Sequence, residues 1–280
     1  MASGCGKCYV AVLPTTDPWR NRRRSAVERI TSRTNPLCTH LRKLGASASY
    51  RHREGQLLCD SPKLVAEAVR WCPESIKTVV CTQGMEVPAL PKSVRVVEVP
   101  GDVMESISPA KTPQGVLAVC SIPDRPMPAK LDGSHYVLLD GVQDPGNVGT
   151  ILRTADAFWA DGLFLVNGCA DIWSPKTVRA SMGAVFRCPV WNAEAGDVMA
   201  LFRDSGIPLY GAALRDDTLD AREVDYTRAA VAIGSEGSGL SRQVLELCDR
   251  TIRIPMRDRC ESLNAAAAAT VLLWEMSNRR

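Results

Sequence analysis

Apolar and polar positions along the first part of this 280-residue chain follow two periods, one typical of helices and one typical of strands. Leucines at helical spacing predict a helix over residues 37–44 that stops at Gly45, and Ser61 followed by Pro62 predicts the start of another. Short apolar and β-branched runs predict strands at 57–59, 77–82, 94–99 and 115–121, with a helical turn at 103–107. This alternation predicts a small α/β/α domain over residues 27–122.

The alternation restarts after a proline-rich segment, which predicts a linker over residues 123–133. Strands are predicted at 136–140, 163–166, 186–191, 209–214, 229–234 and 251–256, and helices at 146–160, 176–182, 197–204, 241–248 and 262–278. The fold class is therefore α/β, with a mostly parallel sheet over residues 134–280 that is covered on both faces. Asn147, Ser241 and Ser262 are candidate helix caps, and the last helix is apolar almost all round, which predicts that it is buried.

Composition places the chain among globular proteins, with 45% apolar and 23% charged residues. No apolar run reaches the ~18–20 residues needed to span a bilayer, and the N-terminus lacks the apolar core of a secretory signal. We therefore expect a cytoplasmic protein without a membrane segment.

Eleven cysteines are present, an odd number, and most stand singly among apolar residues, as reduced core thiols do. Cys5 and Cys8 have the spacing of a zinc half-site or a redox pair, but no second pair completes a metal site. We therefore expect no metal and a disordered basic leader over residues 1–26.

Positive charge gathers at one end of the chain. Residues 1–53 hold eleven lysines and arginines and two acidic residues, so this end carries +9 against −6 for the remainder. A basic end on a near-neutral body favours a polyanionic partner such as RNA, although a solvated leader explains the same pattern.

Three segments place glycines or polar residues directly after a predicted strand, where ligands of parallel sheets bind. They are 139–156, 232–240 and 252–264. Singly, each is equally well explained as a strand–helix joint, a glycine-rich turn or a helix cap. Neither a Walker A pattern nor a dinucleotide GxGxxG is present. The residues alone thus predict an α/β enzyme or ligand-binding protein with a charge pattern suited to RNA.

Taken in order, the three segments resemble motifs 1, 2 and 3 of the SpoU (TrmH) family of the SPOUT methyltransferase superfamily. The residues at the family's catalytic positions are Asn147, Arg153, Glu236, Ser262 and Asn264. The residues at its positions for contacting S-adenosyl-L-methionine are Gly234, Ile254 and Leu263. Residues 30–36 and 111–119 resemble parts of the family's N-terminal L30e-like RNA-binding domain. Two departures are Asp258, where the family usually has glycine, and the segment 58–62, where an acidic-glycine turn is commoner.

The resemblance implies an S-adenosylmethionine-dependent RNA methyltransferase that methylates a ribose 2′-hydroxyl, with a C-terminal trefoil knot and a homodimeric assembly. The extra N-terminal domain of this chain, over residues 27–122, favours ribosomal RNA over transfer RNA as the partner. The family's proposed base falls on Arg153, but arginine stays protonated in proteins, so we expect it to clamp the target phosphate.

Other functions stay open. The chain is alternatively a transfer RNA ribose methyltransferase or a non-catalytic RNA-binding relative. An unrelated nucleotide-dependent enzyme or a cysteine-based redox protein is a weaker alternative, because no phosphate loop or Cys/His pair is placed for it. The role in the cell, housekeeping or antibiotic resistance, is also open.

Overall fold

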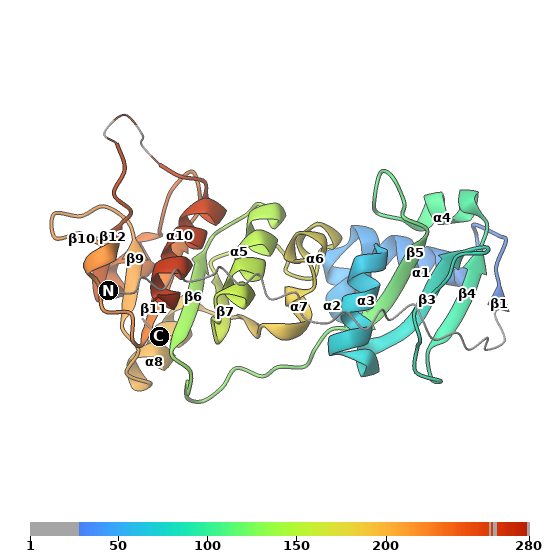
Figure 1. The fold of residues 1–280 in the computed structure, drawn as a ribbon, viewed down its shortest axis with the longest axis horizontal. Coiled ribbons are helices and arrows are strands. Elements are labelled where there is room, and N and C mark those ends of the chain that lie inside the picture. The colour runs from blue at the N-terminus through green and yellow to red at the C-terminus, as the bar shows by residue number, and fades with distance from the viewer. Residues whose placement is uncertain (1–27, 258, 260–261, 279–280) are drawn as a thin grey trace, which may run out of the picture.

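The computed structural model describes residues 28–257, 259 and 262–278, which form two sheets at opposite ends of an elongated molecule (Figure 1). The first sheet has the order β1-β4-β3-β5-β2, with β5 antiparallel to both of its neighbours. Its elements are β1 (Glu28–Arg29), α1 (Pro36–Ala46), α2 (Ala48–Glu54), β2 (Gln56–Cys59), α3 (Pro62–Trp71), β3 (Ile76–Thr82), β4 (Arg95–Val99), α4 (Gly101–Ile107) and β5 (Val116–Ser121).

The second sheet has the order β10-β12-β9-β11-β6-β7-β8, and every neighbouring pair is parallel. Its elements are β6 (His135–Asp140), α5 (Pro145–Ala157), β7 (Gly162–Val166), α6 (Pro175–Ser181), α7 (Ala184–Arg187), β8 (Val190–Asn192), α8 (Ala195–Asp204), β9 (Leu209–Ala212), β10 (Leu219–Asp220), β11 (Ala229–Gly234), α9 (Arg242–Leu247), β12 (Arg250–Arg253) and α10 (Ala265–Ser277). The chain adds strands to one side of β6 and then to the other. The carboxyl ends of β6 and β11 therefore lie side by side at the point where the strand order reverses, which is where such sheets bind ligands.

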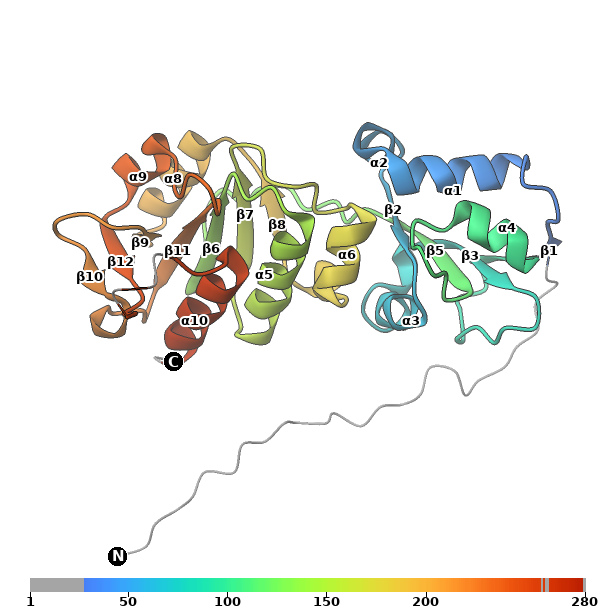
Figure 2. The same ribbon diagram turned by 90° about the horizontal axis from the view of Figure 1, so that it is seen from above.

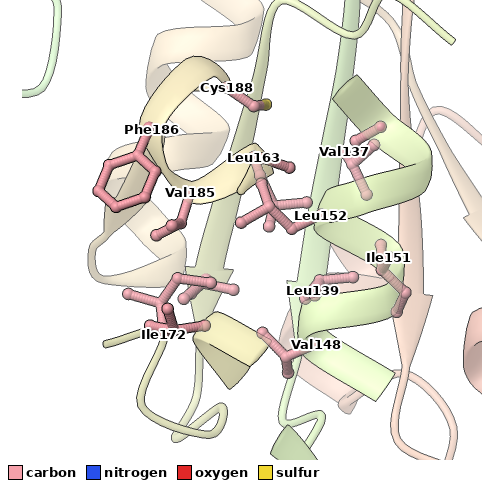
Figure 3. Close-up of a cluster of buried hydrophobic side chains, with 14 of the residues drawn as sticks. Val137, Leu139, Val148, Ile151, Leu152, Leu163, Ile172, Val185, Phe186 and Cys188 are labelled. Atoms are coloured by element: carbon pink, nitrogen blue, oxygen red, sulfur yellow. The ribbon is translucent and has the colours of Figure 1, made fainter. Parts of the chain in front are cut away.

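Helices cover both faces of the parallel sheet, as predicted (Figure 2). The alternation along β6 explains why: Val137 and Leu139 belong to the core under α5 and α10, whereas Tyr136 and Leu138 belong to the core under α8 and α9. Figure 3 shows the first of these cores where α5 packs on β6 and β7. Because the central strands β6, β7 and β11 are buried on both faces, each reads as a nearly continuous apolar run.

The two sheets are joined by one apolar core and by ion pairs. The core under α5 continues through α6 and α7 to residues of β2, α3 and β5, such as Leu57 and Leu64. Arg51 donates from Nε and Nη2 to Asp171 Oδ2 at 3.0 and 2.5 Å, and its side chain is 4% exposed. Arg179 pairs with Asp60 at 2.9 Å. Burial raises the pKa of Asp60 despite this arginine.

One predicted strand is wrong. Residues 184–187 form the helix α7, and of the predicted strand 186–191 only residues 190 and 191 enter the sheet, as part of β8. Gly183, at φ +91°, ends the preceding turn and starts α7, and Pro189 precedes the short strand. An apolar run this short fits a buried helix turn as well as a strand, so its pattern alone could not decide.

Two caps also differ from the prediction. Asp144, not Asn147, caps α5 by accepting from Asn147 N, and Asn264, not Ser262, caps α10. Helix α10 is less buried than its apolar sequence predicted, because Val271 and Trp274 are 42% and 54% exposed. Ser61 and Ser241 cap α3 and α9, as predicted.

Several features fall outside the residues that the structure describes: the basic leader 1–26 with Cys5 and Cys8, and Asp258. The eight cysteines that are described are all free thiols, as predicted. Among the described residues, no helix is long and apolar enough to cross a membrane.

Candidate active site

Three side chains from distant parts of the sequence meet beside the carboxyl end of β11. Asn147 Nδ2 donates to Glu236 Oε1 at 2.7 Å, and Asn264 Nδ2 donates to Asn147 Oδ1 at 3.2 Å. Asn264 Nδ2 also donates to Glu236 Oε1. We call these three residues the amide–carboxylate triad. Its hydrogen bonds fix the Glu236 carboxylate through Oε1, which leaves Oε2 as an acceptor for a ligand.

Local folding explains why the two asparagine side chains reach the triad. Asp144 accepts from Asn147 N at 2.9 Å and therefore supplies the cap of α5, so the Asn147 amide is free to turn outward. Lys176 donates to Asp144 Oδ2 at 2.8 Å, and this hydrogen bond lowers the pKa of Asp144. Asn264 both caps a helix and belongs to the triad. Its Oδ1 accepts from Ala266 N at the start of α10, while its Nδ2 donates to Glu236.

The loop that carries Glu236 is a tight turn between two glycines. Ser235 and Gly239 exchange two backbone hydrogen bonds, of 3.0 and 2.9 Å, and Gly239 adopts φ +67°. A Cβ atom added to Gly234 would lie 2.1 Å from the carbonyl carbon of Gly239. Only glycine at 234 allows the backbones to approach this closely, which holds Glu236 in place.

A cavity of about 640 Å³ lies next to the triad. We call it the loop cavity, and it is lined by residues 212–214, 233–236, 239, 252–257, 262, 263, 265, 268 and 272. Gly234, Ile254, Ser262 and Leu263 all line it, so the three predicted cofactor contacts lie around one space. Its volume is that of a small-molecule site, and its walls combine backbone groups with apolar side chains.

A second cavity, of about 570 Å³, shares Ser235, Glu236 and Gly239 with the first. We call it the polar cavity, and it is lined by residues 140–144, 147, 167, 235–239 and 241. Glu236 therefore stands on the wall between the two cavities, with Asn147 on the polar side.

Arg153 is the one predicted site residue that the structure leaves apart from the others. It is exposed on α5, six residues after Asn147, and lines neither cavity. Six residues of α-helix correspond to ~9 Å along the axis and about 120° of rotation away from Asn147. Within one chain, Arg153 therefore points away from the triad.

Asp140, which was not among the predicted site residues, organises this edge of the sheet. Its carboxylate is 2% exposed and accepts from Asn167 Nδ2 at 2.7 Å and from Ser241 N at 2.5 Å. These bonds join the ends of β6 and β7 to the start of α9. An aspartate closing a buried strand was a signal in the sequence, because a buried carboxylate needs partners.

Within the described part of the chain, no group of three or more His, Cys, Asp or Glu side chains is placed to bind a metal ion. The expected absence of a metal cofactor stays a prediction.

Comparisons with known proteins agree with this geometry. Residues 134–274 match the SpoU rRNA Methylase family, and residues 35–118 match an MRM3-like substrate binding domain. The chain is 31% identical over 229 residues to the 23S rRNA (guanosine(2553)-2′-O)-methyltransferase RlmP of Bacillus subtilis, covering 81% of this chain and 90% of the relative. It is 32% identical over 290 residues to the 23S rRNA (uridine(2479)-2′-O)-methyltransferase of Streptomyces viridochromogenes, covering 93% and 96%.

Among solved structures, an AdoMet-bound rRNA methyltransferase from Sinorhizobium meliloti superposes with a TM-score of 0.78 and 32% identity, covering 90% of this chain and 98% of that one. The matched segment holds the triad and both cavities, and the relatives align over most of their length. This chain therefore belongs to the SpoU rRNA methylase family.

Proposed function

We propose that this protein methylates the 2′-hydroxyl of a ribose in ribosomal RNA, with S-adenosyl-L-methionine as the methyl donor. The observation that carries the proposal is the position of the amide–carboxylate triad between a cofactor-sized cavity and a second, polar cavity. Two relatives that span most of the chain are named as ribosomal RNA 2′-O-methyltransferases, which favours ribosomal over transfer RNA.

The loop cavity has the features that S-adenosylmethionine requires. Backbone groups around Gly234 and residues 252–257 offer hydrogen bonds for the adenine and ribose, while Ile254 and Leu263 exclude water. When bound, the cofactor supplies an electrophilic methyl group for transfer to the ribose oxygen.

The protein's own contribution is to position the hydroxyl. Glu236 Oε1 is held by two amide donors, so Oε2 is fixed and accepts the hydrogen bond of the ribose hydroxyl. Oε2 takes up the hydroxyl proton as the oxygen gains the methyl group, and the hydrogen bond points the oxygen toward the loop cavity. Positioning of this kind contributes up to roughly 7–11 kcal/mol to catalysis. Ser262, on the loop-cavity wall, helps to hold the ribose of the target nucleotide.

Arg153 takes part across a subunit boundary in this account. Helix α10 packs beside α5 and exposes Val271 and Trp274, an apolar face suited to a homodimer contact. A partner that covers this face would bring its own Arg153 toward the triad, where a permanently charged guanidinium pairs with the phosphate of the target nucleotide.

The division of labour follows the two sheets. We propose that residues 134–280 are the catalytic domain and that residues 27–122, joined by the linker 123–133, are an L30e-like domain that binds the RNA. The similarity of residues 35–118 to a substrate binding domain supports this role. We also propose that residues 134–280 contain the trefoil knot that the family resemblance implies. The cytoplasmic location stays a proposal.

Two measurements on the full chain test the proposal. Calorimetric titration with S-adenosylmethionine should reveal one site per subunit, and tritiated cofactor should label ribosomal RNA in preference to transfer RNA. Cofactor binding without labelling of any RNA would instead support the non-catalytic relative, and preferential labelling of transfer RNA would support the alternative substrate.

A further inference from the structure

We propose that the polar cavity holds the base of the nucleotide that is methylated, turned out of the RNA stack. This inference rests on the proposed ribose methylation and deepens it, because it assigns a cavity that the cofactor does not fill. The ligand class is an uncharged nucleobase, recognised by hydrogen bonds to its edges.

The covalent structure of a nucleotide keeps its base close to the reacting oxygen. A base is bonded to C1′, the carbon next to the one that bears the 2′-hydroxyl, so a base lies within a few bonds of the reacting oxygen. That oxygen sits at Glu236, which lines both cavities. The loop cavity is taken by the cofactor, and the polar cavity is the adjoining space on the side of Asn147.

The polar cavity is preorganised. Both oxygens of Asp140 are engaged, one with Asn167 and one with Ser241. Asn167 adopts φ +53°, in the left-handed region that asparagine enters more readily than most other non-glycine residues. Asn167 Nδ2 also donates to Ser241 Oγ at 3.2 Å. The floor of the cavity is therefore fixed before a ligand arrives.

The charged groups that line the polar cavity are acidic. Three carboxylates, of Asp140, Asp144 and Glu236, line the cavity. Lys176 pairs with Asp144 from outside the lining. This balance repels a phosphate and suits a ligand whose edge donates hydrogen bonds to carboxylate and amide oxygens. Bases that leave a stack are recognised in this way, by their exposed edges in a shaped pocket.

Gly237 offers a way to fill the polar cavity without touching the other. It lines only the polar cavity, and a Cβ atom added there meets no atom within 4 Å. Gly237→Trp should therefore block the base while cofactor affinity stays within about twofold of the wild type. Gln143→Trp, from a second exposed residue that lines only this cavity, is an independent blocking variant. Gly196→Trp is the matched control. Gly196 is an exposed residue of α8 that lines neither cavity, and a Cβ atom added there also meets nothing within 4 Å.

The decisive experiment uses the four ribonucleosides as probes. Saturation-transfer NMR is recorded with adenosine, guanosine, cytidine and uridine on protein saturated with S-adenosylhomocysteine, which keeps nucleosides out of the loop cavity. We expect transfer to the base protons of at least one nucleoside, loss of that signal in Gly237→Trp and Gln143→Trp, and its retention in Gly196→Trp. Absence of transfer in the wild type, an unchanged signal in both blocking variants, or displacement by inorganic phosphate would overturn the proposal.

Methyl transfer gives a second readout. Both blocking variants should lose at least about 100-fold in kcat/KM for ribosomal RNA, because a misplaced base misplaces its ribose. Wild-type rates in both would overturn the base site and leave the proposed methylation intact. If the wild type labels no RNA at all, the proposed function fails. The saturation-transfer measurement with nucleosides still decides whether the polar cavity binds a base.

Discussion

At the scale of single residues, the site depends on side chains that serve both the fold and the chemistry. Asn264 is the clearest case, since its oxygen caps α10 and its nitrogen donates to the triad. The sequence suggested Ser262 as the cap, because serine and asparagine two positions apart are both good cap residues. The same ambiguity affected Asp144 and Asn147. Only the three-dimensional arrangement decides which of two suitable side chains caps a helix and which is left for the site.

Substitution of Asn264 separates these two roles. Asn264→Asp keeps an oxygen for the cap but puts a carboxylate in place of the amide donor beside Glu236, so we expect the cap to remain and methyl transfer to slow at least about 100-fold. Asn264→Ala loses both and should also cost about 1 kcal/mol of unfolding free energy. Thermal unfolding and tritiated-cofactor assays measure the two effects. Normal methyl transfer by Asn264→Asp would show that the donor is not needed.

Gly234 is sensitive to the smallest possible change. A methyl group there overlaps the Gly239 backbone, so Gly234→Ala should open the loop and weaken S-adenosylmethionine binding at least about tenfold. Gly237→Ala in the same loop has free space for its methyl group and should bind normally. Calorimetric titration compares the two variants. Equal affinities would mean that the close approach of Gly234 and Gly239 does not shape the cofactor site.

At the scale of elements, apolar periodicity predicted most of the helices and strands that the structure describes, because strands buried on both faces stand out as apolar runs. It missed α2 and the two-residue strands β1 and β10, and it misjudged residues 186–191. The two-residue strands have too few positions to show a period, and α2, of seven residues, has one buried residue, Arg51, and therefore no apolar stripe. The site residues came from a resemblance of ordered motifs, and no local pattern could join Asn147 to Asn264, 117 residues later.

Helix α5 poses the sharpest question at this scale, because it carries both Asn147 and an Arg153 that points elsewhere. If Arg153 acts across a dimer, Asn147→Ala and Arg153→Ala should each be inactive alone. When the two are mixed and allowed to exchange subunits, activity should return to about a quarter of wild type, since half of the dimers are mixed and each has one intact site. No recovery, with exchange verified by mass spectrometry, would place Arg153 outside the reaction or within its own subunit.

At the scale of the whole molecule, the two sheets are held in a fixed relation by buried charge and a shared core. Arg51 of the first unit is almost fully buried and pairs with Asp171 of the second. Such a connection sets the distance between the first sheet and the triad. No local pattern predicted this ion pair, because its two residues are 120 positions apart.

Removal of Arg51 tests this connection. Arg51→Ala leaves a largely buried Asp171 carboxylate without its main partner and should cost about 3–5 kcal/mol of unfolding free energy. Arg33→Ala, which breaks the exposed pair with Asp102, should cost at most about 1 kcal/mol. Chemical denaturation compares them. Equal small losses would indicate that the ion pair does not hold the two units together.

The central claim is that the methyl group is transferred to a ribose and not to a base. Ribosomal RNA is incubated with the protein and S-adenosylmethionine that carries a trideuterated methyl group, digested to nucleosides, and analysed by mass spectrometry with fragmentation at the glycosidic bond. We predict that the label stays with the ribose fragment and that Glu236→Gln abolishes it. Label on the base fragment, or undiminished ribose label with Glu236→Gln, would contradict the assignment of the triad to a ribose hydroxyl.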